Sequence, residues 1–166
     1  MGIRFIADNN VGKLAKWLRI IGYDTLFFKE KDDNKMFEIA LNENRVILTR
    51  DTQLMKRRLV TKGKLRAMLI EQDSPKAQLQ KTIKNLALNY FFNPFSLCLE
   101  CNQALISRGR EEVQKSVPPY VFKTQNQYRE CPLCHRIYWQ GTHWQRMIKE
   151  LNSLTTKGEA EDKGRG

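Results

Sequence analysis

Residues 45–49 read Arg-Val-Ile-Leu-Thr and residues 3–7 read Ile-Arg-Phe-Ile-Ala, and these two short runs decide the fold. Both are rich in β-branched or large apolar side chains, which is typical of strands that are buried in a sheet. Residues 11–21, in contrast, place Leu14, Leu18 and Ile21 on one face of a helix. Helices that separate short buried strands indicate right-handed crossovers and a mostly parallel sheet. We therefore predict an α/β fold for the first half of the chain.

Further strands and helices extend this pattern. Strands are predicted at residues 25–28 and 65–70, and helices at residues 32–41, 51–59 and 75–88. Gly22 offers the left-handed position that ends a helix.

The composition predicts two domains and a tail. The α/β domain is expected to span residues 1–92. Residues 93–150 contain all four cysteines and only short strand-like runs, so they are expected to form a second domain. Residues 151–166 are mostly polar and mixed in charge, and we expect them to be disordered.

The charge of the chain indicates the class of its partner. Its 166 residues include 29 Lys and Arg against 18 Asp and Glu, a net charge of +11. Such an excess favours a polyanion, and nucleic acid is the commonest one. No apolar run approaches the roughly 18–20 residues of a membrane helix, and the charged start gives no signal peptide. We expect a soluble, cytoplasmic protein with no membrane partner.

The cysteines form two C-x-x-C pairs, Cys98 with Cys101 and Cys131 with Cys134. Two such pairs can direct four thiolates at one Zn²⁺ ion, and four protein ligands leave no open position, so the zinc would be structural. The long stretch between the pairs is explained by an inserted hairpin. A c-type haem attachment through residues 131–135 would leave the first pair unexplained, and a thioredoxin-like site would lie near a βαβ unit. A zinc ribbon is therefore predicted.

Aromatic residues follow the second pair, from Tyr138 to Trp144, close to Arg136 and Arg146. Aromatic rings beside basic residues suit stacking on unpaired bases. The alternative is that they pack the ribbon. Packing is favoured for Trp139, whereas Trp144 and His143 remain open between the two interpretations.

Three carboxylates fall near the carboxyl ends of the predicted strands, where open α/β sheets bind ligands. Asp8 follows the first strand, Asp51 follows the third, and Asp33 opens the helix between the second and third. Crowded carboxylates repel one another unless cations join them, and oxygen ligands suit Mg²⁺ or Mn²⁺. Helix capping is the competing interpretation for Asp33 and Asp51.

Several of these stretches together resemble one known family. They are residues 8–19, residues 22–25, Leu-Thr-Arg-Asp at 48–51, the four cysteines, and Tyr138-Trp139 followed by Gly141 and His143. This pattern, which extends from residue 3 to about residue 150, resembles the Mut-seven C-terminal ribonuclease family, a branch of the PIN-like nucleases that carries a C-terminal zinc ribbon.

The resemblance implies a PIN-like nuclease domain over residues 1–92 and a metal-dependent ribonuclease that acts on RNA, expected to be single-stranded. Asp8, Asp33 and Asp51 would be the catalytic ligands of Mg²⁺ or Mn²⁺, and Asn10 would lie near the metal. A fourth acid would be Glu71 or Asp73, and the pattern does not decide between them. His135 stands where a small residue is expected.

Basic residues near these acids are candidates for binding the RNA backbone. Lys13 and Arg19 lie on the helix that starts beside Asp8, and Arg50 directly precedes Asp51. The run Lys56-Arg57-Arg58 is typical of a solvated face, so we assign it only a weak electrostatic role. The alternative function is a non-catalytic RNA-binding zinc-ribbon module.

Overall fold

The computed structural model describes residues 2–163 of the chain. The chain divides into two compact units between Phe95 and Ser96, close to the expected boundary after residue 92. Each unit has its own cluster of buried apolar side chains.

The first unit is built on a parallel sheet of four strands, β1 (Arg4–Ala7), β2 (Thr25–Phe27), β3 (Arg45–Thr49) and β4 (Ala67–Leu69), in the order β2-β1-β3-β4. All three strand pairings are parallel, and Phe5 lies opposite both Thr25 and Val46. The predicted α/β fold with a mostly parallel sheet is therefore confirmed. The sheet edge at which the strands end gathers the chain segments that follow Ala7, Phe27, Thr49 and Leu69.

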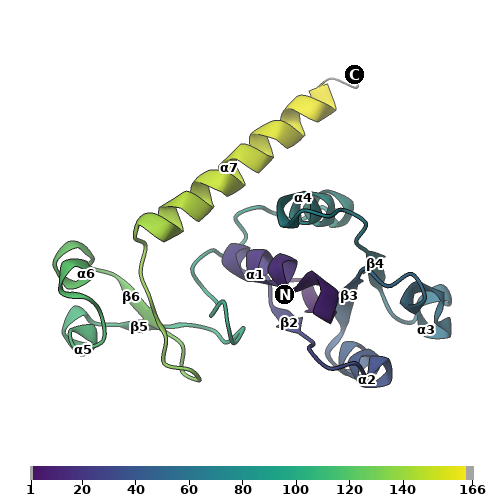
Figure 1. The fold of residues 1–166 in the computed structure, drawn as a ribbon, viewed down its shortest axis with the longest axis horizontal. Coiled ribbons are helices and arrows are strands. Elements are labelled where there is room, and N and C mark those ends of the chain that lie inside the picture. The colour runs from purple at the N-terminus through teal and green to yellow at the C-terminus, as the bar shows by residue number, and fades with distance from the viewer. Residues whose placement is uncertain (1, 164–166) are drawn as a thin grey trace. The chain divides into compact units, whose positions relative to one another are not determined.

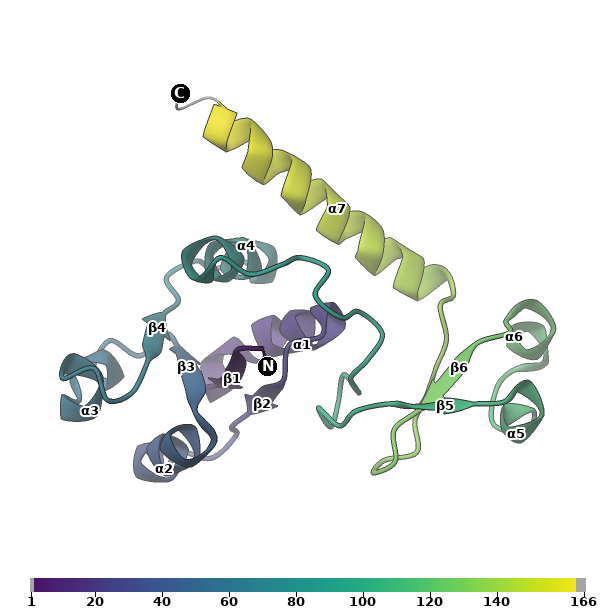
Figure 2. The ribbon, with the colours of Figure 1, turned by 180° about the vertical axis from the view of Figure 1, so that it is seen from behind.

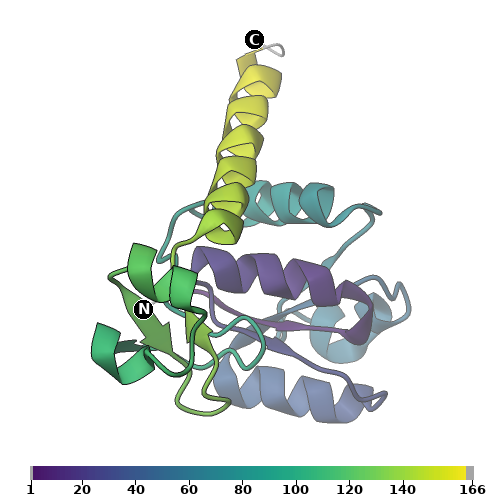
Figure 3. The same ribbon diagram turned by 60° about the vertical axis from the view of Figure 1, so that its left-hand side comes forward.

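Helices cover both faces of this sheet (Figures 1 and 3). Helix α2 (Asp33–Glu43) covers one face, where Met36, Phe37 and Ala40 join Ile6 and Ile47 in a buried cluster. Helices α1 (Gly12–Ile21) and α4 (Pro75–Leu86) lie on the other side. The sheet is thus buried on both faces, which explains why its central strands are almost wholly apolar.

Two local features of this unit test the sequence predictions. Gly22 ends α1 at a φ of 109°, and a Cβ atom there would lie 2.2 Å from the Asn93 carbonyl oxygen, so only glycine fits. The helix predicted over residues 51–59 is instead a 3₁₀ turn, Leu54–Lys56, followed by the short helix α3 (Arg58–Thr61). Only Leu54 is buried among the residues of these two elements, so little apolar packing supports a longer helix.

The second unit contains an antiparallel sheet, β5 (Ile106–Arg108), β6 (Tyr128–Glu130) and β7 (Ile137–Tyr138), in that order. Helices α5 (Arg110–Val113) and α6 (Pro119–Thr124) connect β5 to β6, as Figure 2 shows. The insertion between the cysteine pairs is thus a hairpin with a helical connection. Val113, Val117, Val121 and Tyr128 form its buried cluster.

Helix α7 (Thr142–Lys163) contradicts the expected disorder of residues 151–163, whereas residues 164–166 lie outside the described residues. Leu151 and Leu154 are buried, at 0% and 5% exposed, and they continue the helical spacing of Met147 and Ile148. The prediction gave too much weight to the polar residues between them. No helix in the described part of the chain has the length and apolar character needed to cross a bilayer.

Candidate active site and metal centre

The strand order places two of the predicted acids at the centre of one sheet edge. From β1 the chain crosses to β2 on one side and then returns to β3 on the other, so β1 and β3 flank a topological switch point. Ligands of open α/β sheets bind at such points, beyond the carboxyl ends of the strands. Asp8 follows β1 directly, and Asp51 lies two residues beyond β3.

Thr49, the last residue of β3, connects Asp8 to Asp51. Its buried hydroxyl donates a 2.7 Å hydrogen bond to Asp8 Oδ2 and accepts a 3.0 Å hydrogen bond from the backbone N–H of Asp51. Asp8 Oδ1 also accepts from the Asn9 amide at 2.8 Å, and Asp8 as a whole residue is only 8% exposed. An ionised carboxylate has about four acceptor positions, so Asp8 retains capacity for a further ligand.

The alternative interpretation, in which Asp33 and Asp51 serve as helix caps, has a different outcome for each residue. The cap of α2 is Asp32, whose side chain accepts from the Lys35 amide at 3.1 Å, and Asp33 is the first helical residue. Asp51 Oδ1 accepts from the Gln53 amide at 2.9 Å, so one of its oxygens does stabilise the turn before residues 54–56. Asp33 is thus not the residue that caps α2, while one oxygen of Asp51 stabilises a turn.

Electrostatics connect Asp33 to the other two acids. Burial raises the pKa of Asp33, and the charges of Asp8 and Asp51 raise that pKa further, whereas Arg57 lowers it. Asp33 therefore lies within electrostatic range of both other carboxylates although the three come from separate segments. Repulsion of this kind favours the binding of a cation among them.

The carboxylates are nevertheless less tightly grouped than the cysteines. Within the described residues, the four cysteines are the one set of three or more acidic, His or Cys residues whose ligand atoms lie within 4.8 Å of one another. Mg²⁺ keeps several waters and is commonly held by one or two carboxylates together with substrate phosphates. The donor chemistry of the acids fits that ion, in an open arrangement.

Asn10 and Arg50 connect the ends of three strands. Asn10 Oδ1 accepts from the Arg50 amide at 3.2 Å, which links the segments after β1 and β3. The Arg50 guanidinium donates to the carbonyl of Gln72 and pairs with Asp73 at 2.9 Å. Asp73 is 97% exposed and faces Arg50, and Glu71 is exposed as well, so neither supplies a buried fourth acid.

The structure does not bring every predicted basic residue to this edge. Lys13 is exposed at the start of α1, near Asp8 in sequence. Arg19 lies at the far end of α1, where it is 7% exposed and its Nε donates to the Thr25 carbonyl at 2.9 Å. Since β2 begins at Thr25, Arg19 lies at the opposite edge of the parallel sheet from the acids, so the structure does not bring this predicted RNA-binding residue to the acid edge.

Arg57 is a basic residue of the acid edge that the sequence interpretation undervalued. Its guanidinium donates to Asn34 Oδ1 at 2.6 Å, lies 4.7 Å from the ring centroid of Phe37, and acts on the charge of Asp33. Asn34 directly follows Asp33, so these contacts fix a cation beside the acids. The run Lys56-Arg57-Arg58 contains no signal that distinguishes Arg57 from its neighbours.

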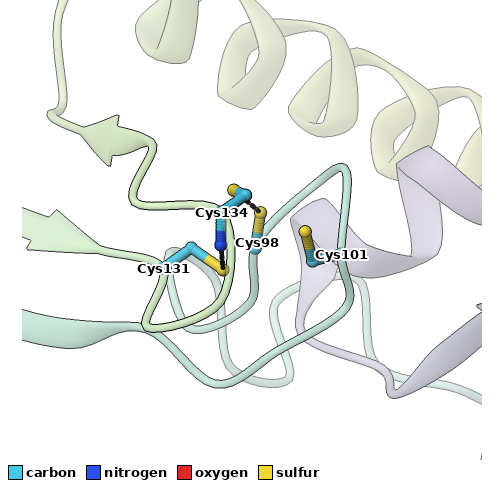
Figure 4. A group of neighbouring side chains, drawn as sticks. All are labelled: Cys98, Cys101, Cys131 and Cys134. Carbon is cyan, nitrogen blue, oxygen red and sulfur yellow. Dashed lines mark hydrogen bonds between the residues drawn. The ribbon is translucent and has the colours of Figure 1, made fainter.

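The cysteine cluster lies in two turns of the second unit (Figure 4). One turn lies between the paired residues Leu97 and Ala104, and the other joins β6 to β7. Both turns have the same hydrogen bonds. Asn102 and His135 donate their amides to the carbonyls of Cys98 and Cys131, each at 2.9 Å, and both adopt a φ of 63°. His135 thus occupies a left-handed position that favours a small residue.

The environment of the thiols suits a bound cation. Burial raises the pKa of Cys98, but hydrogen bonds with Tyr138 and from the amides of Cys101 and Glu100 outweigh it and lower the pKa to about 7. The nearby Cys134 thiol, together with burial, raises the pKa of Cys101 to about 12. The four sulfurs cannot all ionise this close together without a cation, and four of them match the tetrahedral ligand set of zinc.

Comparison with known proteins identifies the family of the chain. No curated protein and no solved structure matches the chain. The Mut7-C RNAse domain family matches residues 3–151, which include all the acids and cysteines discussed above. Because the match covers both units in one continuous stretch, the chain belongs to the Mut7-C RNAse domain family.

Proposed function

We propose that the protein is a metal-dependent ribonuclease in which Asp8, Asp33 and Asp51 bind Mg²⁺ or Mn²⁺ and hydrolyse phosphodiester bonds of single-stranded RNA. The observation that carries the proposal is that Asp8 and Asp51 follow β1 and β3 at the switch point and that their charges act on Asp33. Membership of a ribonuclease domain family supports RNA as the substrate.

Each acid has a distinct part in this proposal. When bound, the divalent ion supplies a water of lowered pKa and neutralises charge on the phosphate. Asp8 is held by hydrogen bonds from Thr49 and Asn9, and its carboxylate retains acceptor capacity for an ion. Asp51 is fixed through its amide and one oxygen, and Asp33 gains the most from a cation because its neighbours disfavour its charge.

Basic and polar residues would hold the RNA backbone. Arg57 is fixed beside Asp33, Arg50 is fixed across the ends of β3 and β4, and Lys13 is exposed on α1. Phosphate contacts of this kind position a strand without reading its sequence. Asn10 would act through Arg50 by keeping the two central loops in place.

The four cysteines would bind one structural Zn²⁺. Cys98 and Cys101 come from one turn and Cys131 and Cys134 from the other, so the ion would join the two turns of the second unit. All four positions would be filled by thiolates, which leaves none for a substrate.

The test is cleavage of end-labelled single-stranded RNA by zinc-loaded protein with and without Mg²⁺ or Mn²⁺. Asp8→Asn and Asp51→Asn should abolish the metal-dependent cleavage, and a duplex of the same sequence should be cleaved more slowly. Asp32→Ser is the matched control, because it removes a neighbouring acid and keeps an oxygen that can cap α2. Equal cleavage by the wild type and both Asn variants would contradict the proposal.

The second candidate is an RNA-binding module without catalysis. The spacing of the carboxylates favours it, since they do not reach the 4.8 Å grouping that the cysteines show. It requires strongly salt-dependent binding that Asp8→Asn and Asp51→Asn leave intact, with no cleavage in either metal. The same set of proteins therefore separates the two functions.

A further inference from the structure

The second unit contains a cavity of about 190 Å³ that has no part in the chemistry above. Its walls come from the first cysteine turn, from β7 and the loop after it, and from the start of α7. Of its eight lining residues, four carry aromatic rings, namely Tyr138, Trp139, His143 and Trp144, and the others are Leu99, Ile137, Gly141 and Met147.

Two walls of the cavity are held in place by the fold. The Tyr138 hydroxyl lies 3.2 Å from Cys98 Sγ and accepts from the Leu99 amide at 3.1 Å, so this wall is tied to the first cysteine turn. Trp139 packs on the buried cluster of the unit, and its ring lies 2.9 Å from where a Cβ atom of Gly141 would be. The cavity is therefore preformed, and the absence of a side chain at residue 141 is part of its construction.

The size and lining of the cavity match one planar ring system. Sites for drug-sized ligands enclose about 300–1,000 Å³, so this cavity is too small for a complete cofactor. Aromatic walls stack on flat rings, and the indole and imidazole groups add hydrogen-bonding edges. An aliphatic side chain of a protein partner would use neither property.

Charge around the cavity favours an anionic chain. Residues 131–149, which include every lining residue except Leu99, contain Arg136, Arg146 and Lys149 and no Asp or Glu, while Glu100 follows Leu99. The charge of Arg136 acts on Tyr138, so this cation lies close to one wall. A ligand that combines flat rings with a negative backbone is a nucleic acid strand.

We propose that this cavity binds one unpaired nucleobase of single-stranded RNA, with Arg136 beside the adjoining phosphate. The site rests on the proposed function only in that RNA is the ligand, and its test does not depend on cleavage. The proposal assigns base stacking to Trp144 and His143. The sequence alone does not decide whether these two residues stack on bases or pack the ribbon.

The test measures binding by fluorescence anisotropy with full-length, zinc-loaded protein in buffer without Mg²⁺ or Mn²⁺. The probes are a labelled short oligouridylate and the abasic sugar–phosphate chain of the same length. Trp144→Ala should weaken binding of the oligouridylate about 5- to 150-fold, the range of base–aromatic stacking, and leave binding of the abasic chain unchanged. Tyr120→Ala, which removes an aromatic residue 67% exposed on α6, is the matched control and should change neither affinity.

Trp144→Phe keeps a ring and should retain most of the affinity for the oligouridylate, and zinc content confirms that each variant is folded. Equal weakening of both probes by Trp144→Ala, or no weakening of either, would overturn the proposal. If cleavage fails while the oligouridylate still binds better than the abasic chain, the base site stands and the ribonuclease proposal falls.

Discussion

The two candidate metal centres of this protein differ in how tightly their ligands are held. The four cysteine sulfurs lie within 4.8 Å of one another in two turns with the same backbone hydrogen bonds. The three acids come from separate segments, at β1, α2 and β3, and they influence one another through charge rather than contact. One cluster offers four ligand atoms close enough to enclose a single ion, and the other is a looser set of carboxylates.

This difference is what the two proposed roles require. A structural ion contributes most to stability when the protein supplies every ligand. A catalytic ion needs free positions for water and phosphate, so its ligands must be fewer and the apo site carries unrelieved repulsion. We therefore expect substitutions at the cysteines to affect folding and substitutions at the acid edge to affect chemistry.

Removal of zinc should have the largest effect. Structural zinc sites in small domains contribute about 10–16 kcal/mol of apparent binding free energy, and this energy is coupled to folding. Cys131→Ser, or treatment with a strong chelator, should unfold the second unit and leave the first folded, since the buried cluster around Ile6 and Ile47 lies wholly in residues 6–65. Hydrogen exchange should become fast in β5–β7 and stay slow in β1–β4.

Asp51→Asn is the control for this measurement, because it should retain one zinc per chain and unchanged exchange in β5–β7. Slow exchange in β5–β7 after zinc is lost would show that the cysteine cluster does not hold the unit together.

Arg57→Ala should lower the rate of RNA cleavage at the acid edge. If Arg57 meets a substrate phosphate, cleavage should fall about 10- to 150-fold, because a hydrogen bond to a charged group contributes about 1.5–3 kcal/mol. Arg57→Lys should recover part of the rate, since lysine keeps the charge but not the planar fork. Arg58→Ala, which changes the next residue in the same run, is the control. An equal loss of cleavage in both Ala variants would show that Arg57 contributes only through the overall positive charge of the run.

Thr49→Val should lower both the stability of the first unit and the rate of RNA cleavage. The substitution keeps the buried volume but removes the donor to Asp8 and the acceptor for the Asp51 amide. Urea denaturation should show a loss of about 1–3 kcal/mol. Cleavage should also fall, because both acids lose the group that positions them. Thr49→Ser keeps the hydroxyl and should cleave at a rate close to the wild type, so similar rates for the two variants would contradict this role of Thr49.

The parts of this molecule that the sequence predicts are those in which a residue type alone restricts the structure. A β-branched run such as residues 45–49 indicates a buried strand, and two C-x-x-C pairs indicate a common metal site. Arg19 was misplaced because helical periodicity does not show which sheet edge a residue reaches. Arg57 was undervalued because its contact with Asn34 joins residues far apart in the chain. The continuation of α7 had a signal, the spacing of Leu151 and Leu154, that polar composition obscured.

His135→Gly should increase the affinity of the cysteine cluster for zinc. A non-glycine residue at a φ of 63° carries a backbone cost, and glycine relieves it while increasing the freedom of the unfolded chain. We expect a net gain of about 0.5–1 kcal/mol, measured as zinc affinity about 2- to 5-fold tighter in competition with a chelator. Asn102→Gly, at the equivalent position of the other turn, should gain less because asparagine tolerates this conformation. A loss of affinity in His135→Gly would mean that the imidazole itself stabilises the turn.

Asp33→Asn should have the smallest effect on the free energy of unfolding. Its sign should be opposite to that of a cysteine substitution. The pKa of Asp33 is raised above its ordinary value of 3.8, so folding favours its protonated form. The stability that protonated Asp33 contributes is present below the unfolded pKa and is lost as the pH rises through the folded pKa.

At neutral pH, therefore, Asp33→Asn should stabilise the zinc-loaded protein without Mg²⁺, by at most about 0.5 kcal/mol. The gain should shrink on acidification, and Mg²⁺ should reverse it by binding the wild type more tightly. Thermal unfolding at several pH values measures this, with Glu38→Gln on α2 as the control. A cysteine variant loses stability when its ligand is removed, whereas this acid variant gains it. A loss of stability in Asp33→Asn at neutral pH would show that the ionised Asp33 side chain stabilises the fold, which contradicts a site that needs a cation to relieve repulsion.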